Sequence, residues 1–136
     1  MSIAGEEAMN KLDHDYFVAQ QKITAMRDLK PGWNSYRGAP IGDGARGRAM
    51  RLLELLRAEN TPVPGVGPTP DGGVQLAWSL PSARGQLELE VTLLDSGGEY
   101  SFGYRDEDGF IAEGRVESVE VIASELRTTM MSAAAA

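Results

Sequence analysis

The residue type most often used for acid–base chemistry occurs once, as His14 in the run Asp13-His14-Asp15. A histidine between two carboxylates can act as a general base or as a metal ligand. The surrounding segment has the spacing of a helix, where neighbouring side chains point about 100° apart and cannot converge on one ion. We therefore expect His14 to lie on a solvated helix face, and we assign it neither a catalytic role nor a metal.

Clustered carboxylates offer a second route to chemistry, in the acidic run Asp106-Glu107-Asp108. Carboxylate oxygens are the ligands that divalent cations prefer, but this run lacks the spaced ligands and the closing glutamate of a calcium loop. Gly109 follows it, as in a tight turn. We expect a solvated hairpin tip, no cofactor, and a chain that is not an enzyme. The weakest alternative is a hydrolase or metal enzyme that uses His14 or this run.

Gly42, Gly44 and Gly47 form a literal G-x-G-x-x-G motif. In dinucleotide-binding proteins this motif follows a strand and opens a helix inside a βαβ unit. Here Pro40 and an aromatic loop precede it, and no parallel strand is expected after it. We interpret the glycines as the start of a helix that Asp43 or Gly42 caps.

Trp33 and Tyr36 lie in a connector that is otherwise rich in turn-forming residues. Because large aromatic side chains are costly to leave in water, the simplest expectation is that they fold back onto the core. The alternative is a small-ligand or peptide-binding surface, in which Trp33 and Tyr36 stack on the ligand beside Arg37, with Trp78 as a further aromatic contact.

The 136 residues carry a formal net charge of −7 and contain no cysteine. A hydrophobic content of 42% fits a folded chain with one core. The negative charge repels phosphate, so we expect a basic protein partner and no direct nucleic-acid binding. The lack of cysteine fits a reducing cytosol, and no signal peptide or membrane span is recognisable. We expect a cytoplasmic protein without a membrane partner.

Three helices are predicted from apolar residues that recur at spacings of three and four. They cover about 6–29, about 43–59 and about 118–131, and the first ends at Pro31-Gly32. The expected inward positions of the first two helices are Leu12, Tyr16, Ala19, Ile23, Met26, Ala45, Ala49, Leu52, Leu53 and Leu56.

Strand signals begin after the turn Asp71-Gly72-Gly73, where Val74, Leu76 and Trp78 alternate with polar or small residues. Three further strands are expected, each after a turn that contains glycine, at 85–94, about 100–104 and about 110–116. Three prolines from 62 to 68 permit at most an edge strand before the turn.

One face of this sheet is expected to be apolar and the other acidic, which is typical of a sheet that helices cover on one side. Arg115 lies on the acidic face, and the hairpin tip adds further carboxylates. The residues expected to bind the basic partner are Glu88, Glu90, Glu113, Asp106, Glu107 and Asp108.

Two segments carry a resemblance: Gly32-Trp33-Asn34-Ser35-Tyr36 and, after a helix, the run from Pro68 to Trp78, PTPDGGVQLAW. Their order resembles a widespread group of small uncharacterised bacterial and phage proteins with the pattern GWDGYGAP, a helix and PTPDGGVQLEW. The resemblance covers about residues 29–115, and it implies a fold and a bacterial or phage origin rather than an activity. Asn34 and Arg37 depart from the pattern.

The expected fold is α+β: a four-stranded antiparallel β-meander with helices packed on one face, plus an N-terminal amphipathic helix. The expected divisions are the helix in 1–30, one α+β domain in 31–131 and a frayed tail in 132–136.

The leading hypothesis for function is a small acidic inhibitor of antitoxin, immunity or anti-defence (anti-CRISPR-like) type. It would block a basic surface of a toxin or of a nucleic-acid-binding effector. An edge strand, or the exposed part of the first helix, offers a surface for pairing with a second copy.

Overall fold

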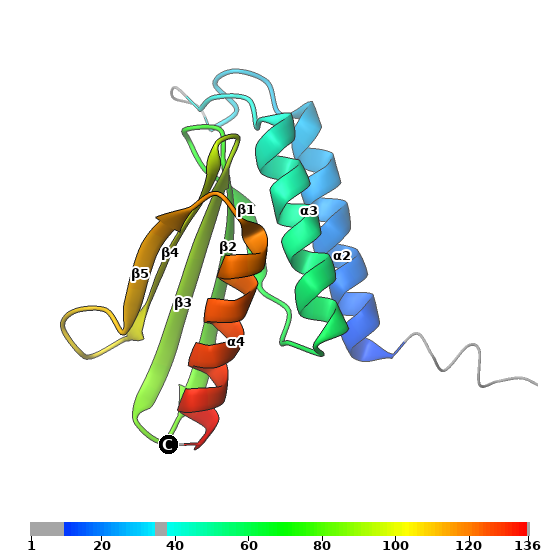
Figure 1. The fold of residues 1–136 in the computed structure, drawn as a ribbon. Coiled ribbons are helices and arrows are strands. Elements are labelled where there is room, and N and C mark those ends of the chain that lie inside the picture. The colour runs from blue at the N-terminus through cyan, green and yellow to red at the C-terminus, as the bar shows by residue number, and fades with distance from the viewer. Residues whose placement is uncertain (1–9, 35–37, 136) are drawn as a thin grey trace, which may run out of the picture.

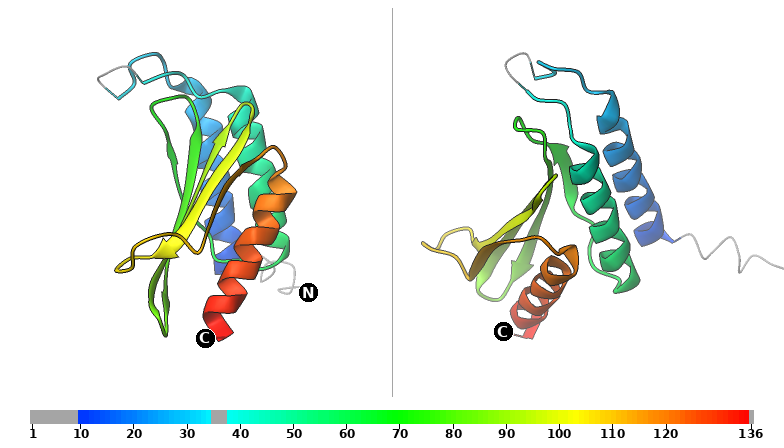
Figure 2. Two further views of the ribbon diagram at one scale, coloured as in Figure 1. Left: turned by 60° about the vertical axis from the view of Figure 1, so that its left-hand side comes forward. Right: turned by 45° about the horizontal axis from the view of Figure 1, so that its top comes forward.

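A computed structural model describes residues 10–34 and 38–135. Its elements are α2 (Lys11–Ala25), the 3₁₀ turn η1 (Met26–Asp28), α3 (Asp43–Ala58), β1 (Gly65–Pro68), β2 (Val74–Ser82), β3 (Gly85–Leu94), β4 (Gly97–Tyr104), β5 (Ala112–Val116) and α4 (Val119–Ala135). The strands pair antiparallel in the order β1-β2-β3-β4-β5, and the helices lie on one side of the sheet (Figures 1 and 2). The fold class is α+β, as predicted.

The sheet has five strands, so the prediction of four was wrong. The additional strand is β1, which pairs Gly65 with Ala77 and Pro68 with Val74. Its position at the edge agrees with the rule that proline, which has no N–H to donate, is tolerated on an edge strand. The sequence limited this segment to an edge strand but did not show that it would pair.

The alternation in β2, β3 and β4 sorts their residues onto two faces. Along one row of the register Trp78 pairs with Leu89, which in turn pairs with Phe102, and all three are buried. The next row consists of Ala77, Glu90 and Ser101, on the opposite face. The helices therefore cover the apolar face, and none of the described elements covers the polar face.

Helix α3 packs on β2 and β3, whereas α4 packs on β4 and β5 and against α3. Gly98 allows α4 to lie close to the sheet, because a Cβ at this position would lie 2.6 Å from Cδ1 of Ile122. Helix α4 extends to Ala135, beyond its expected end at Met131, and Ala133 is only 7% exposed.

Helix α2 begins at the cap Asn10, whose side chain accepts a hydrogen bond from the N–H of Asp13. Tyr16, Ala19 and Ile23 are buried and belong to the same core as the sheet. Phe17 remains 49% exposed. The part of the expected helix before residue 10 lies outside the described residues.

The aromatic connector is fastened to the turn between β1 and β2. The N–H of Ala39 donates to the carbonyl of Pro70 at 2.8 Å, and the N–H of Gly42 donates to Gly72 at 3.1 Å. Gly72 has a φ of +91°, the left-handed region that favours glycine in such a turn. The two segments that dominate the sequence pattern thus lie against each other in space.

Within residues 10–34 and 38–135, none of the helices has both the length and the apolar character needed to cross a membrane.

Candidate functional site

His14 is exposed, and the carboxylates beside it face other partners. Asp13 pairs with Arg57 at 3.1 Å, and Asp15 pairs with Lys11 at 2.9 Å. The three residues of the Asp-His-Asp run therefore do not form one acid–base or metal site.

The glycine-rich start of α3 is occupied by a carboxylate from another part of the chain. Oδ1 of Asp95, in the turn between β3 and β4, accepts a hydrogen bond from the N–H of Ala45 at 2.9 Å. A Cβ on Gly42 or Gly44 would overlap this carboxylate. The glycines make room for Asp95 at the position where a nucleotide-binding motif would hold phosphate. Gly42, one of the two residues expected at this position, is the N-cap. Because glycine has no side chain to accept a hydrogen bond, the capping acceptor is supplied by Asp95.

Two of the aromatic residues proposed as a ligand surface, Trp33 and Trp78, are used in structural contacts. The indole N–H of Trp33 donates to the carbonyl of Ala39 at 2.7 Å. Trp78 is 4% exposed, and its indole N–H donates to the carbonyl of Pro62 at 2.6 Å. Tyr36 and Arg37 lie outside the described residues. The structure therefore does not offer Trp78 as a stacking surface.

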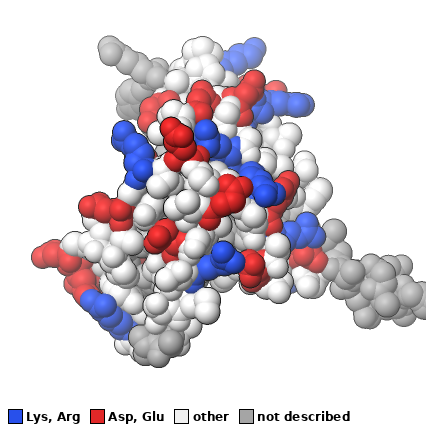
Figure 3. Space-filling view, viewed as in Figure 1, with Lys and Arg blue, Asp and Glu red and all other residues white. Residues whose placement is uncertain are grey.

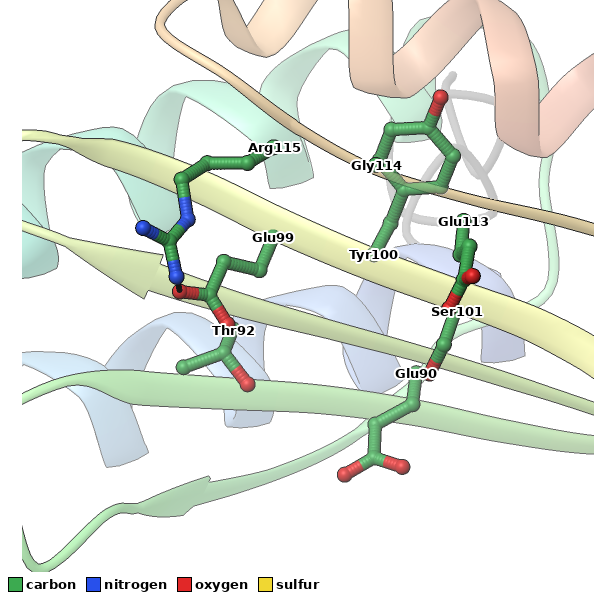
Figure 4. A pocket seen from close by; sticks show the side chains of 8 residues that line it. All are labelled: Glu90, Thr92, Glu99, Tyr100, Ser101, Glu113, Gly114 and Arg115. Carbon is green, nitrogen blue, oxygen red and sulfur yellow. Dashed lines mark ion pairs between the residues drawn. The ribbon is translucent and has the colours of Figure 1, made fainter.

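The predicted acidic residues of the sheet, Glu88, Glu90 and Glu113, lie on its uncovered face. Glu90 and Glu113 share one row, with Ser101 of β4 between them. Figure 4 shows this row beside Arg115 and Glu99, which point toward each other. Two strand spacings place the Cα atoms of Glu90 and Glu113 about 10 Å apart.

Two of the four glutamates on this face are neutralised by arginine. Glu88 pairs with Arg105 at 2.5 Å, and Glu99 pairs with Arg115 at 2.6 Å. Glu99 was not among the predicted residues. It completes the row of Thr92 and Arg115.

Glu90 and Glu113 have no cation within ion-pair distance among the described residues. Glu90 accepts a hydrogen bond from the side-chain amide of Gln75, which brings no charge. Both glutamates are exposed. This pair, which we call the open carboxylate pair, is the uncompensated negative charge of the uncovered face.

The acidic hairpin tip lies at one end of the same face. Glu107 receives two hydrogen bonds from the guanidinium of Arg84, at 2.7 and 3.0 Å, and this contact raises the pKa of Arg84. Asp106 and Asp108 are exposed. The structure thus anchors the middle residue of the tip and leaves the outer two facing solvent.

The uncovered face is hollowed along its length. A hollow of about 580 Å³ is lined by both carboxylates of the open pair, and one of about 340 Å³ extends from Glu90 and Ser101 to the hairpin tip. Phe110, 61% exposed, lines the second hollow. Sequence reasoning missed Ser101 and Phe110. Ser101 faces outward by the same alternation that places Glu90 and Glu113.

The side that carries the helices has a different charge pattern, in which Lys and Arg are interleaved with Asp and Glu (Figure 3). Arg51 pairs with Glu54 at 3.3 Å and with Glu120 at 3.5 Å, and Arg127 pairs with Glu59 at 3.0 Å. Three arginines of α3 thus have a carboxylate partner: Arg46 pairs with Asp43, Arg51 with Glu54 and Arg57 with Asp13.

In the described part of the chain, no three His, Cys, Asp or Glu side chains are grouped so that they could hold a metal ion. The chain matches no protein-family model, no curated protein and no solved structure.

Proposed function

We propose that this chain is a small inhibitor of antitoxin, immunity or anti-defence type, which binds a basic surface of its partner with the uncovered face of its sheet. The observation that carries this proposal is the open carboxylate pair, Glu90 and Glu113, on a hollowed face. The net charge of −7 also supports it. We further propose that the chain shares a bacterial or phage origin with the group that it resembles.

The face suits a cationic partner for a physical reason. Lys or Arg side chains that approach Glu90 and Glu113 meet carboxylates that no cation in the described part of the chain has already neutralised. Complementary charge accelerates encounter and disfavours partners of the wrong sign. Phe110 adds an exposed aromatic residue at one end of the hollows, and aromatic residues are frequent contacts in protein interfaces.

The test begins with the full chain, tagged and used to capture partners from a bacterial lysate. The captured protein is then purified, and its affinity for the chain is measured at low and at physiological salt. Glu90→Lys should weaken binding about tenfold, because it replaces an uncompensated carboxylate with a cation. The wild-type affinity should also fall as salt rises.

Glu54→Lys is the matched control, since it makes the same change of charge on helix α3 and should leave the affinity unchanged. Circular dichroism confirms that both variants are folded. Equal binding by Glu90→Lys and the wild type would remove the uncovered face from the proposal. Capture of no protein other than the chain itself would count against the inhibitor function.

A further inference from the structure

The two edges of the sheet differ in their capacity to accept another strand. At the β1 edge, Pro68 has no N–H, Pro62 and Pro64 precede the strand, and α2 packs against it. The opposite edge is β5 (Ala112–Val116), which contains no proline. Unpaired backbone groups on such an edge can bind a further strand.

The hydrogen-bonding pattern shows which residues of β5 face outward. Just after β4, the N–H of Arg105 donates to the carbonyl of Gln86 at 2.9 Å, so this odd-numbered residue directs its backbone groups toward β3. Because the direction alternates along a strand, the other odd-numbered residues of β4 do the same, and the even-numbered residues direct their backbone groups toward β5. The register pairs even residues of β4 with even residues of β5. The N–H and C=O groups of Glu113 and Arg115 therefore point to the open edge.

Glu113 and Arg115 also make this edge complementary to itself. If a second β5 pairs antiparallel about Gly114, Glu113 of each copy lies opposite Arg115 of the other. These are hydrogen-bonded positions, so each of the two symmetric pairs exchanges two backbone hydrogen bonds. Ala112 then lies opposite Val116 on the apolar face. One register thus satisfies the backbone, the charges and the apolar positions together.

Helix α4 fits the same arrangement. Its residues Glu120 and Arg127 pair with α3, so the helix presents its other flank to the side away from α3. That flank carries Val121, which is 43% exposed, with Glu125 and Ser132. Because α4 packs on the face of β4 and β5 that lies on the helix side of the sheet, pairing of two β5 strands would place the α4 helices of the two copies on the same side of the joined sheet.

We infer that the chain forms a symmetric homodimer through antiparallel pairing of its β5 edges, which joins two sheets into one of ten strands. The occupant of this edge is a second copy, because opposite charges two residues apart suit an antiparallel copy of the same strand. In the dimer Arg115, which pairs with Glu99 of its own chain, also lies opposite Glu113 of the other copy, and Glu90 keeps its uncompensated charge. The inference does not depend on the proposed inhibitor function.

The test measures the mass of the full chain by light scattering and by sedimentation over a range of concentrations. The wild type should reach twice the 14.6 kDa of one chain. Glu113→Lys places two cations opposite each other, and Arg115→Glu places two carboxylates opposite each other. Each single variant should weaken the dimer about tenfold or more, because each change acts at both symmetric pairs. The double variant restores opposite charges and should recover the dimer.

Glu90→Lys is the matched control on the same face and should remain dimeric. Circular dichroism verifies the fold of each variant. A wild type that stays monomeric, a dimer unaffected by either single change, or a double variant no better than the singles would each overturn the inference. The partner-binding test uses Glu90, so its outcome is read separately from that of the dimer.

Discussion

Tyr16 is a single residue that joins two parts of the chain. Its side chain is fully buried, and its hydroxyl donates to the carbonyl of Thr61 at 2.8 Å. The next carbonyl along, that of Pro62, accepts from the indole of Trp78. These two aromatic side chains fix the connector between α3 and β1 to the core, which allows the proline-rich segment to enter the sheet.

Tyr16→Phe should lower the free energy of unfolding by about 1–2 kcal/mol at pH 8. The substitution keeps the ring but leaves the buried carbonyl of Thr61 without its hydroxyl donor. Urea denaturation measures the change. Phe17→Leu, at the neighbouring position that is 49% exposed, is the control and should change the stability little.

The same residue predicts a pH dependence, because burial raises the pKa of Tyr16. Above pH of about 10 the unfolded chain releases this proton while the folded chain retains it. The contribution of Tyr16 to the free energy of unfolding is therefore fully present below that pH. Above it, this contribution falls by up to about 1.4 kcal/mol per pH unit. The difference between wild type and Tyr16→Phe should shrink between pH 9 and 11. A difference that stays constant would contradict this account.

At the level of single residues, alternation was enough to place Glu88, Glu90 and Glu113 on one open face. It did not identify Glu99, because the sequence predicted that this strand begins only at about residue 100. The strand begins at Gly97, and the turn consists of Asp95 and Ser96 only. Sequence also could not show which glutamates are neutralised, since that depends on contacts such as Arg105 with Glu88 between strands.

At the scale of elements, α3 is held to the sheet at its first turn by the β3–β4 turn. Asp95 caps the N–H of Ala45 with its side chain, and its backbone carbonyl accepts a hydrogen bond from Nε of Arg48 at 3.4 Å. A carboxylate at a helix N-terminus satisfies a free N–H and interacts favourably with the helix dipole. The cap comes from a residue 50 positions away, which local sequence rules for helix ends cannot detect.

Asp95→Ala should lower the free energy of unfolding by about 1 kcal/mol, the usual effect of losing an N-cap. Gly42→Ala should be destabilising in the wild type because its methyl group displaces the Asp95 carboxylate. With Asp95→Ala already present, the same glycine substitution should have little further effect. Urea denaturation of the two single variants and the double variant measures this coupling. Additive effects would mean that the glycine is not there to accommodate Asp95.

The elements themselves were largely predictable, because apolar periodicity is strong in α3, β2 and β3. The missed strand β1 shows the limit of that signal. Gly65 to Pro68 contains a single large apolar residue, Val66. Its pairing depends on β2 and on the turn that Thr69 and Gly73 close with a hydrogen bond of 2.9 Å. A strand that forms because a neighbouring strand pairs with it does not need strong apolar alternation in its own sequence.

At the scale of the whole molecule, α2 shares one core with the α+β body. Tyr16, Ala19 and Ile23 are at most 4% exposed and belong to the same cluster as the buried side chains of the sheet. The sequence, by contrast, suggested a helix in residues 1–30 that could be set apart from a domain starting at residue 31. The shared core indicates that the two parts fold together.

Deleting residues 1–30 should therefore abolish cooperative unfolding rather than yield a stable smaller domain. Burial of a large apolar side chain stabilises the folded state by about 1.5–3 kcal/mol, so the buried side chains of α2 together contribute roughly 5 kcal/mol to the free energy of unfolding. This contribution is comparable to the whole stability of many small domains. The loss of the Tyr16 hydroxyl would also release the carbonyl of Thr61. Thermal and urea unfolding, monitored by circular dichroism, measure the effect of the deletion. Phe17→Ala in the full chain is the control, because it changes α2 at an exposed position and leaves the buried face of the helix intact. A truncated chain with a sharp transition near that of the full chain would show that α2 is a dispensable addition, and that the remaining helices and sheet form a complete core without it.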